Sequence, residues 1–250
     1  TMSNIRVIYF KNNKMEKKQT TIVNIQQDKP SSQPLFFGEP MGLQKYTDFR
    51  YPVLQDIWRN NMVGFFWTPN EVDLSQDKND FAILSGHEKF MFTKNLGYQT
   101  LLDTMQARGI HHIAQYVSNL ETEAICSWWA SYEIMHSFSY THIVKGIYPD
   151  ADVVFDEIKN DDAIIKRTES VAKYYDALIE GITEEMGTMT EAEKKHALKK
   201  QLYLTLVSIN ILEGIRFYVS FACSYAFVES GRGMEGNAKV ISLINRDENV

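Results

Sequence analysis

Cysteine is scarce in this sequence, and the 250 residues contain only Cys126 and Cys223, with no CxxC spacing. Both lie in apolar stretches that we expect to be helical. We interpret them as buried thiols of a protein in a reducing compartment. A redox role for either thiol is the less favoured alternative.

A basic stripe is also lacking. The chain has 26 Lys and Arg against 32 Asp and Glu, which gives a formal net charge of -6. Surfaces that bind nucleic acid or anionic membranes are positively charged, so this balance argues against both kinds of partner. The rest of the composition is ordinary for a globular protein, and the length favours one large domain.

No continuous apolar core marks residues 1–30 as a secretory signal, because they are rich in Lys, Asn and Gln. Residues 202–227 are apolar enough to raise the question of a membrane span. Glu213 and Arg216 lie at the centre of this stretch, where ionisable groups are costly in lipid. We therefore expect a helix buried on all sides within a soluble, cytoplasmic bundle.

Convincing period-two alternation is absent, which predicts an all-α fold. We expect residues 1–33 to form a flexible extension, with Met15 as an alternative start, and residues 34–250 to form one domain. Gly86 is expected to interrupt the second helix and Gly109 to end it. The predicted helices span residues 48–66, 80–108, 120–144, 156–181, 191–228 and 234–248.

Glu133-x-x-His136 places a carboxylate and an imidazole on one helix face. Such a pair can bind one metal ion, and the carboxylate can bridge to a second. An exposed, solvated Glu/His pair is the alternative. The surrounding residues are apolar around most of the helix, and a buried charge needs a partner or a metal. These neighbours are Trp128, Trp129, Ile134, Met135 and Phe138.

Two more carboxylates lie in apolar stretches, Glu213 and Asp103, and Glu248 lies near the end of the chain. Each could be salt-bridged, with Arg216 and Arg246 as candidate partners. Acidic groups on several core helices are harder to explain without cations. A site rich in oxygen ligands with an imidazole suits iron or manganese rather than zinc.

Tyr140 follows His136 by four residues, so its phenol should point toward whatever His136 binds. A packed core tyrosine is one interpretation. A redox-active phenol oxidised by the metal centre is the sharper one. Phe217 and Phe221 follow Glu213 at helical spacing and could form the dry wall that a radical needs, or be plain core residues.

Together these motifs closely resemble the small subunit of class I ribonucleotide reductase, of the tyrosyl-radical, di-iron type. The resemblance runs in order from about residue 34 to residue 248. The matching motifs are Phe36-Phe37-Gly38, Phe65-Phe66-Trp67-x-Pro69-x-Glu71-Val72, Tyr98-Gln99-x-Leu101-Leu102-Asp103, Glu133-x-x-His136-Ser137-x-Ser139-Tyr140-Thr141-His142, Leu212-Glu213-x-Ile215-Arg216-Phe217-Tyr218-Val219-Ser220-Phe221-Ala222-Cys223, Met234-Glu235-Gly236-Asn237-Ala238-Lys239 and Arg246-Asp247-Glu248.

The resemblance implies a ferritin-like helical bundle with a two-metal site in its core. Asp103, Glu133 and His136 would hold one iron ion. Glu213 and Glu248 would belong to the second ion, with Glu133 and Glu248 bridging the pair. Manganese is the alternative metal, and dioxygen would activate the centre.

The resemblance also assigns the neighbouring residues. Tyr140 would carry the radical. Trp67 and Asp247 would form, with His136, a hydrogen-bonded route for an electron and a proton. Trp129 would lie beside Glu213.

The implied activity is that of a ribonucleoside-diphosphate reductase component, working with a large subunit and forming a homodimer. The family pattern also expects a histidine three residues after Glu248, beyond these 250 residues. A split subunit completed by a second polypeptide or an interrupted gene is favoured over a truncated record, and we expect the chain alone to be inactive. The alternatives are a ferritin-like di-metal oxidase or metal-binding protein, and an inactive remnant.

Overall fold

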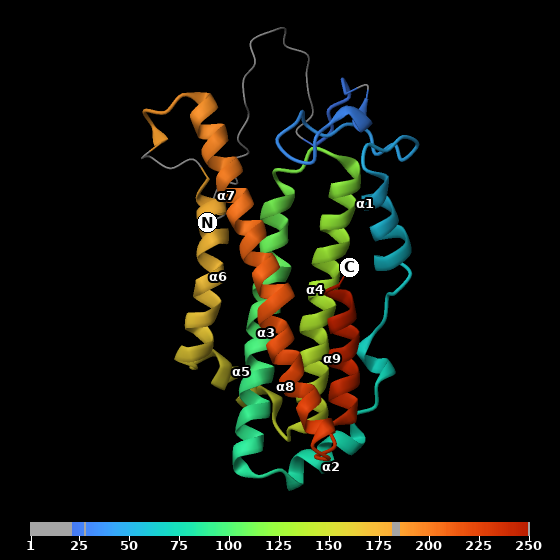
Figure 1. Ribbon diagram of the computed structural model, residues 1–250, viewed down its shortest axis with the longest axis vertical. Helices are drawn as coiled ribbons and strands as arrows, with labels where there is room; N and C mark the ends of the chain where they lie inside the picture. Colours follow the sequence, from blue (N-terminus) through green and yellow to red (C-terminus); the bar gives the residue numbers. More distant parts are fainter. Residues whose placement is uncertain (1–21, 28, 182–185, 250) are drawn as a thin grey trace.

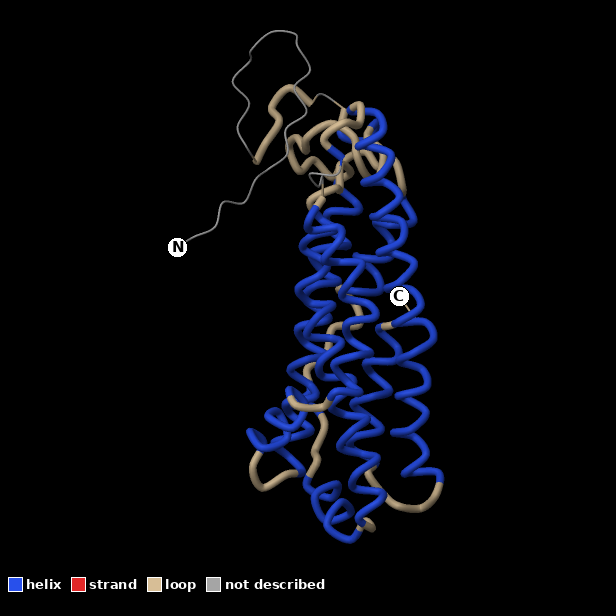
Figure 2. The backbone as a smooth tube through the Cα atoms, turned by 90° about the vertical axis from the view of Figure 1, so that its left-hand side faces the viewer, coloured by secondary structure: helices blue, strands red, loops and turns tan. Residues whose placement is uncertain are grey.

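The chain folds into an elongated bundle whose long helices run side by side (Figures 1 and 2). The computed structural model describes residues 22–27, 29–181 and 186–249. Within these ranges no strand forms, and one isolated bridge joins Phe36 to Val117. The all-α prediction is confirmed. The main helices are α1 (Pro52–Asp56), α2 (Ser75–Ile83), α3 (Gly86–Ala114), α4 (Leu120–Ile147), α5 (Ala151–Lys159), α6 (Asp162–Glu180), α7 (Glu191–Ile211), α8 (Phe217–Glu229) and α9 (Glu235–Asp247).

Helices α3 and α4 form the centre of the bundle and are joined by a short connection. Their first turns are capped by side chains, which explains where they begin. Ser85 and Glu88 form a capping box at the start of α3, and the Asn119 side chain accepts a hydrogen bond from the Thr122 amide of α4. Three of the five predicted metal ligands, Asp103, Glu133 and His136, lie on this helix pair.

Gly109 does not end its helix, as the sequence had predicted, because α3 continues to Ala114. A Cβ atom at Gly109 would lie 2.3 Å from the Tyr175 ring of α6. The glycine is therefore required by close helix packing rather than by a turn. The predicted interruption near Gly86 is confirmed, since α2 ends at Ile83 and α3 begins at Gly86.

The predicted helix over residues 156–181 is wrong, because two helices, α5 and α6, occupy this region. The chain turns at Asn160, and the Asp161 carboxylate then accepts hydrogen bonds from the amides of Ala163 and Ile164. Asn and Asp side chains compete with the helical hydrogen bonds of the backbone and favour caps. That competition explains the break.

The predicted helix over residues 191–228 forms one continuous path, but it contains a π-helical segment, η5 (Leu212–Arg216), between α7 and α8. By length and composition Glu191–Glu229 could span a membrane, and only 33% of its most apolar window is buried. Tyr203, Ile215 and Val219 are more than half exposed. The prediction of a helix buried on all sides is therefore wrong. One of its faces is apolar and open.

The first helix is shorter than predicted. It begins at Pro52, as α1, and continues into a second π-helical segment, η2 (Ile57–Met62). Before it, Asn24 donates its amide hydrogen to the Met41 carbonyl at 2.7 Å, so this part of the amino-terminal segment contacts the chain that follows. The predictions for residues 1–21, including Met15 as an alternative start, lie outside the described residues.

The two cysteines are free and differ in environment. Cys126 is buried on α4, whereas Cys223 on α8 is half-buried, so the expectation of two buried thiols is confirmed for the first alone.

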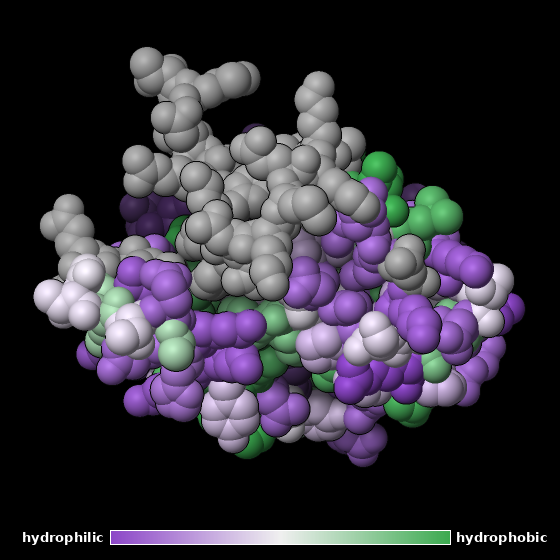
Figure 3. All heavy atoms as spheres, turned by 90° about the horizontal axis from the view of Figure 1, so that it is seen from above, coloured by the Kyte–Doolittle hydropathy of each residue, from purple (hydrophilic) through white to green (hydrophobic). Residues whose placement is uncertain are grey.

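Seen from above, the end of the bundle carries many hydrophilic side chains with hydrophobic ones scattered between them (Figure 3).

Candidate metal centre

Five side chains from four parts of the bundle converge at its centre. One ligand atom each from Asp103, Glu133 and His136 lie within 4.8 Å of one another, and the same holds for Glu133, Glu213 and Glu248. The structure thus brings together all five residues predicted from the sequence as metal ligands. Glu133 belongs to both groups, which is the position of a bridging ligand.

The carboxylates of this cluster are buried and incompletely paired. Asp103 is fully buried, and neither of its oxygens has a hydrogen-bond partner among the described residues. One oxygen each of Glu133, Glu213 and Glu248 is also without one. Burial of a carboxylate without compensation is costly. Oxygen atoms in this state, beside an imidazole, fit hard cations such as iron or manganese.

His136 presents its two ring nitrogens to different partners. Its Nε2 lies 3.2 Å from Oδ2 of Asp247, and its Nδ1 lies 3.3 Å from Oε1 of Glu248 and 3.7 Å from Oε2 of Glu133. When Nε2 carries the proton and donates it to Asp247, Nδ1 keeps its lone pair directed at the cluster. This orientation would let His136 bind a metal ion through Nδ1.

The salt-bridged alternative is not supported. Arg216 donates a hydrogen bond to the Ser170 hydroxyl at 2.8 Å, and Arg246 contacts Asp247 at 3.0 Å. Within the described part of the chain, no Lys or Arg forms an ion pair with the four clustered carboxylates. Their charge is left for protons or metal ions to neutralise.

The pKa values of the cluster reflect this crowding. Burial raises the pKa of Asp103 and of Glu213 well above the usual value, and the nearby carboxylates raise both further. Burial alone would lower the pKa of His136, but hydrogen bonding to Asp247 and to the glutamates raises it well above the ordinary value. Metal ions and protons therefore compete for the same atoms.

A continuous chain of hydrogen bonds leaves the cluster toward the surface. Trp67 donates its indole hydrogen to Oδ2 of Asp247 at 2.6 Å, and the same oxygen faces Nε2 of His136. Arg246 binds the other Asp247 oxygen at 3.0 Å. These positions match the route that the sequence resemblance implied for Trp67, Asp247 and His136.

Trp129 lines the same cavity as Glu213, beside which the resemblance had placed it. Its indole hydrogen is donated to Oε1 of Glu133 at 2.8 Å. Residues 129 and 133 are four apart on α4, so their side chains meet on successive turns. Glu213 instead accepts a hydrogen bond from the Gln106 amide of α3, a contact that was not predicted.

Gln106 could have been found from its spacing, because it lies three residues after Asp103 and on the same face of α3. Tyr175 could not have been found this way. Its hydroxyl donates to Oε1 of Gln106 at 2.8 Å from a separate helix, α6. Only the packing of α6 on α3 reveals that contact.

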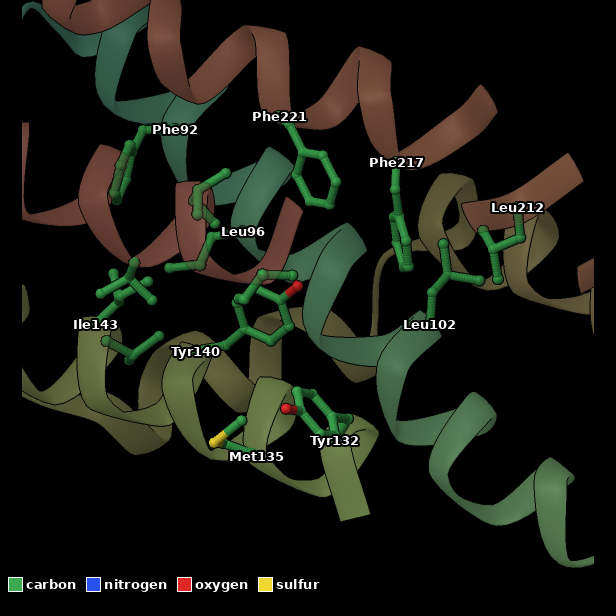
Figure 4. Close-up of a cluster of buried hydrophobic side chains, with 14 of the residues drawn as sticks. Phe92, Leu96, Leu102, Tyr132, Met135, Tyr140, Ile143, Leu212, Phe217 and Phe221 are labelled. Atoms are coloured by element: carbon green, nitrogen blue, oxygen red, sulfur yellow. The ribbon is translucent and has the colours of Figure 1, made fainter. Parts of the chain in front are cut away.

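Tyr140 is fully buried one turn beyond His136 on α4. Figure 4 shows its ring packed near Phe221 of α8 and Leu96 of α3. Its hydroxyl has no hydrogen-bond partner among the described residues. Burial, together with the negative charge of Asp103, raises the pKa of Tyr140 well above its usual value. The phenol is thus kept protonated in a dry pocket beside the cluster.

Phe217 and Phe221 are both buried, and their ring centroids lie 5.8 Å apart. They form part of the apolar wall of α8 (Figure 4). On the other side of the cluster lies a cavity of about 320 Å³, which Trp129, Tyr132 and Met62 line together with the clustered glutamates. The ligands therefore lie between a closed apolar wall and a cavity.

Comparison with known proteins agrees with this geometry. Residues 44–250 match the family described as the small chain of ribonucleotide reductase. The subunit beta of ribonucleoside-diphosphate reductase from Haemophilus influenzae is 46% identical over 227 residues, covering 86% of this chain and 60% of that protein. The chain thus spans about 60% of the length of this curated relative.

Solved structures of the same fold confirm the expected ferritin-like bundle. The ribonucleotide reductase R2 subunit from Clostridium botulinum superposes with a TM-score of 0.77 and 23% identity, covering 94% of this chain and 69% of that one. Streptococcus sanguinis dimanganese(II)-NrdF gives a TM-score of 0.64 and 23% identity, covering 85% of this chain and 67% of its own. The chain belongs to the small-chain family of ribonucleotide reductase.

Proposed function

We propose that this chain forms the metal- and radical-bearing part of a ribonucleoside-diphosphate reductase small subunit. One observation carries the proposal. Glu133 belongs to two adjoining groups of metal-ligand atoms, and the buried phenol of Tyr140 lies one turn beyond His136 on the same helix. Two ions and an oxidisable tyrosine can occupy such a site together.

The donor set fits two metal ions. Asp103, Glu133 and His136 would hold the first ion, and Glu133, Glu213 and Glu248 the second. With dioxygen, the bound pair would supply the oxidising power that is stored on tyrosine. We propose iron, with manganese as the alternative, because oxygen ligands and an imidazole suit both. The Streptococcus sanguinis neighbour is a dimanganese(II) protein.

The residues around the metal pair have separate roles. Tyr140 keeps its proton until it is oxidised, because burial disfavours the phenolate. Phe217 and Phe221 exclude water from one side. Asp247 accepts hydrogen bonds and fixes the orientation of His136, while Trp67 extends this contact away from the metals. Together, His136, Asp247 and Trp67 would move an electron and a proton.

The whole reductase needs more than this chain. We propose a cytoplasmic small subunit that dimerises and works with a large subunit, which reduces ribonucleotides to deoxyribonucleotides. The histidine that the family pattern expects three residues after Glu248 would come from further polypeptide, either continuous with this chain or separate. An exposed apolar face along α7, η5 and α8, which includes Tyr203, Ile215 and Val219, is consistent with such association.

The test is reconstitution with iron and dioxygen in the presence of the candidate completing polypeptide, followed by electron paramagnetic resonance. A tyrosyl signal is expected from the wild-type assembly and none from Tyr140→Phe. Tyr148→Phe is the matched control, because Tyr148 is a half-buried tyrosine whose hydroxyl is hydrogen-bonded to Thr93, away from the cluster. A metal-loaded assembly without a tyrosyl signal would contradict the proposal.

A di-metal oxidase or ferritin-like metal-binding protein is the second candidate, because it would share the carboxylate cluster. Such a protein would not need Trp67 and Asp247 in a hydrogen-bonded chain with His136. The contact between these three residues therefore favours the reductase. Oxidation of ferrous iron with equal yield in wild type and Trp67→Phe, and with no radical in either, would favour the oxidase.

A further inference from the structure

We infer that Tyr175 and Gln106 are positioning residues that hold one oxygen of Glu213 and leave the other for a metal ion. The inference rests on the proposed function, in which Glu213 is a ligand of the second ion. It adds two residues, on α6 and α3, to the machinery of that ion. Neither was predicted as part of the site.

The contacts form an unbroken buried chain. The Tyr175 hydroxyl donates to Oε1 of Gln106 at 2.8 Å, and Nε2 of Gln106 donates to Oε1 of Glu213. Gln106 is fully buried, and Tyr175 and Glu213 are also buried. Water therefore has little access with which to replace either hydrogen bond.

The chemistry of these groups fixes the direction of both hydrogen bonds. An amide side chain has one oxygen acceptor and one nitrogen donor group. When the Tyr175 hydroxyl occupies the oxygen of Gln106, the nitrogen must face Glu213. A carboxylate can only accept, so Glu213 requires the nitrogen, and the Tyr175 hydroxyl stabilises that orientation of the amide by donating to the remaining oxygen.

The hydrogen bond divides the two oxygens of Glu213 between different tasks. Oε1 accepts from Gln106, whereas Oε2 has no hydrogen-bond partner among the described residues. Glu133 shows the same division, because Oε1 accepts from Trp129 and Oε2 has no such partner. In both glutamates an uncharged donor holds one oxygen and leaves the other within the cluster.

Glu213 needs such support because of its backbone. It lies in η5, where the chain leaves α-helical geometry for one turn of π-helix. Single π-helical turns occur frequently at functional sites. There the side chain is displaced from the regular helix face, and a hydrogen bond from α3 fixes its direction.

Gly109 provides independent evidence that the Tyr175 ring has a required position. The ring packs against α3 one turn beyond Gln106, where a Cβ atom would lie 2.3 Å from it. Real Cβ contacts are not that short, so a side chain at residue 109 would displace the ring. The helix is thus free of a side chain where the tyrosine must approach Gln106.

Cobalt(II) titration of the full 250-residue chain, followed by visible absorption, tests the inference without an activity assay. Removal of a group that orients a metal ligand typically weakens metal affinity about 10- to 100-fold. Tyr175→Phe is expected to lower the affinity for the second cobalt ion by that factor. The affinity for the first ion, which His136 would hold, should stay unchanged. Tyr116→Phe is the matched control. The Tyr116 hydroxyl donates to the Leu178 carbonyl of α6, the helix that also carries Tyr175, but it does not contact Gln106.

A double-mutant cycle separates positioning from general destabilisation. Gln106→Met removes the donor to Glu213. It should weaken binding of the second ion at least as much as Tyr175→Phe does. If the tyrosine acts through the glutamine, the double variant should bind no more weakly than Gln106→Met alone. If the two residues only stabilised the fold, the variants would bind both ions more weakly, and their losses of binding free energy would add in the double variant.

The outcomes are distinct. The inference is overturned if Tyr175→Phe binds both ions like Tyr116→Phe, or if the wild-type chain binds no second ion that depends on Glu213. Failure of the proposed function would look different. In that case Glu133→Gln and His136→Ala would leave all cobalt binding unchanged.

Discussion

Trp67 and Asp247 are 180 residues apart in the chain and are joined by a hydrogen bond of 2.6 Å. Through this bond the segment after η2 is attached to the end of α9. Asp247 also faces His136, so the contact links the amino-terminal part of the bundle to the candidate metal centre. Trp67→Phe tests what this bond contributes.

Trp67→Phe should lower the free energy of unfolding by about 1–3 kcal/mol, because a buried charged acceptor loses a donor. Asp247 would keep its contacts with His136 and Arg246, which limits the loss. Denaturant unfolding measures it. Trp128→Phe is the control, since that indole lies on the same helix as His136 but outside the hydrogen-bonded chain. Equal losses in the two variants would count against a specific role for Trp67.

Asp77 caps α9 from a different helix, α2, and should influence the metal cluster from a distance. Its carboxylate accepts hydrogen bonds from the backbone amides of Gly236 and Asn237. Asp77→Ala is expected to cost about 1–2 kcal/mol of stability, as loss of a helix cap does. Because α9 carries Asp247 and Glu248, cobalt binding should weaken as well.

Asp73→Ala is the control for this prediction, since Asp73 bonds only to the local turn at Ser75. Calorimetry and cobalt titration of both variants make the comparison. If Asp77→Ala unfolds at the wild-type temperature, α9 does not depend on this cap.

Gly109→Ala should destabilise the bundle by about 1–3 kcal/mol, because the added methyl group must displace the Tyr175 ring. Gly86→Ala is the matched control at another helical glycine. Nothing lies within 4 Å of a Cβ atom there, so the change should be neutral or stabilise the protein by up to about 1 kcal/mol. Thermal unfolding of the two variants should move in different directions, and equal destabilisation would contradict the packing argument.

Cys126 should react with alkylating reagents much more slowly than Cys223 at pH 8. Burial, and then the charge of Glu123, raises the pKa of Cys126 to about 11, so very little reactive thiolate exists below that pH. The rate at Cys126 should rise toward pH 11, with peptide mass spectrometry as the measurement. In denaturant the two thiols should react alike. A fast native reaction at Cys126 would contradict its buried environment.

Much of the site could be predicted because its residues follow local rules. Glu133 and His136 are neighbours on one helix, and charged residues in apolar stretches stand out without any structure. Contacts between separate helices were harder to predict from the sequence. The bond from Gln106 to Glu213 and the approach of Tyr175 both depend on how separate helices pack, whereas the bond from Trp129 to Glu133 lies within α4.

The predicted helix boundaries were wrong where a residue type that often ends a helix has another structural role. Gly109 is typical of a helix end but serves close packing, and Asp161 both caps α6 and forms an ion pair with Lys94 at 2.8 Å. The periodicity of residues 191–228 correctly predicted a helix. It could not show that Glu213 lies in a π-helical turn or that one apolar face stays open.

Anomalous diffraction from crystals grown with iron or manganese is the most direct test of a shared two-metal centre. Two peaks are predicted, one beside Asp103 and His136 and the other beside Glu213 and Glu248, with Glu133 between them. Peaks elsewhere, or side chains of these five residues turned away from any bound ion, would contradict it.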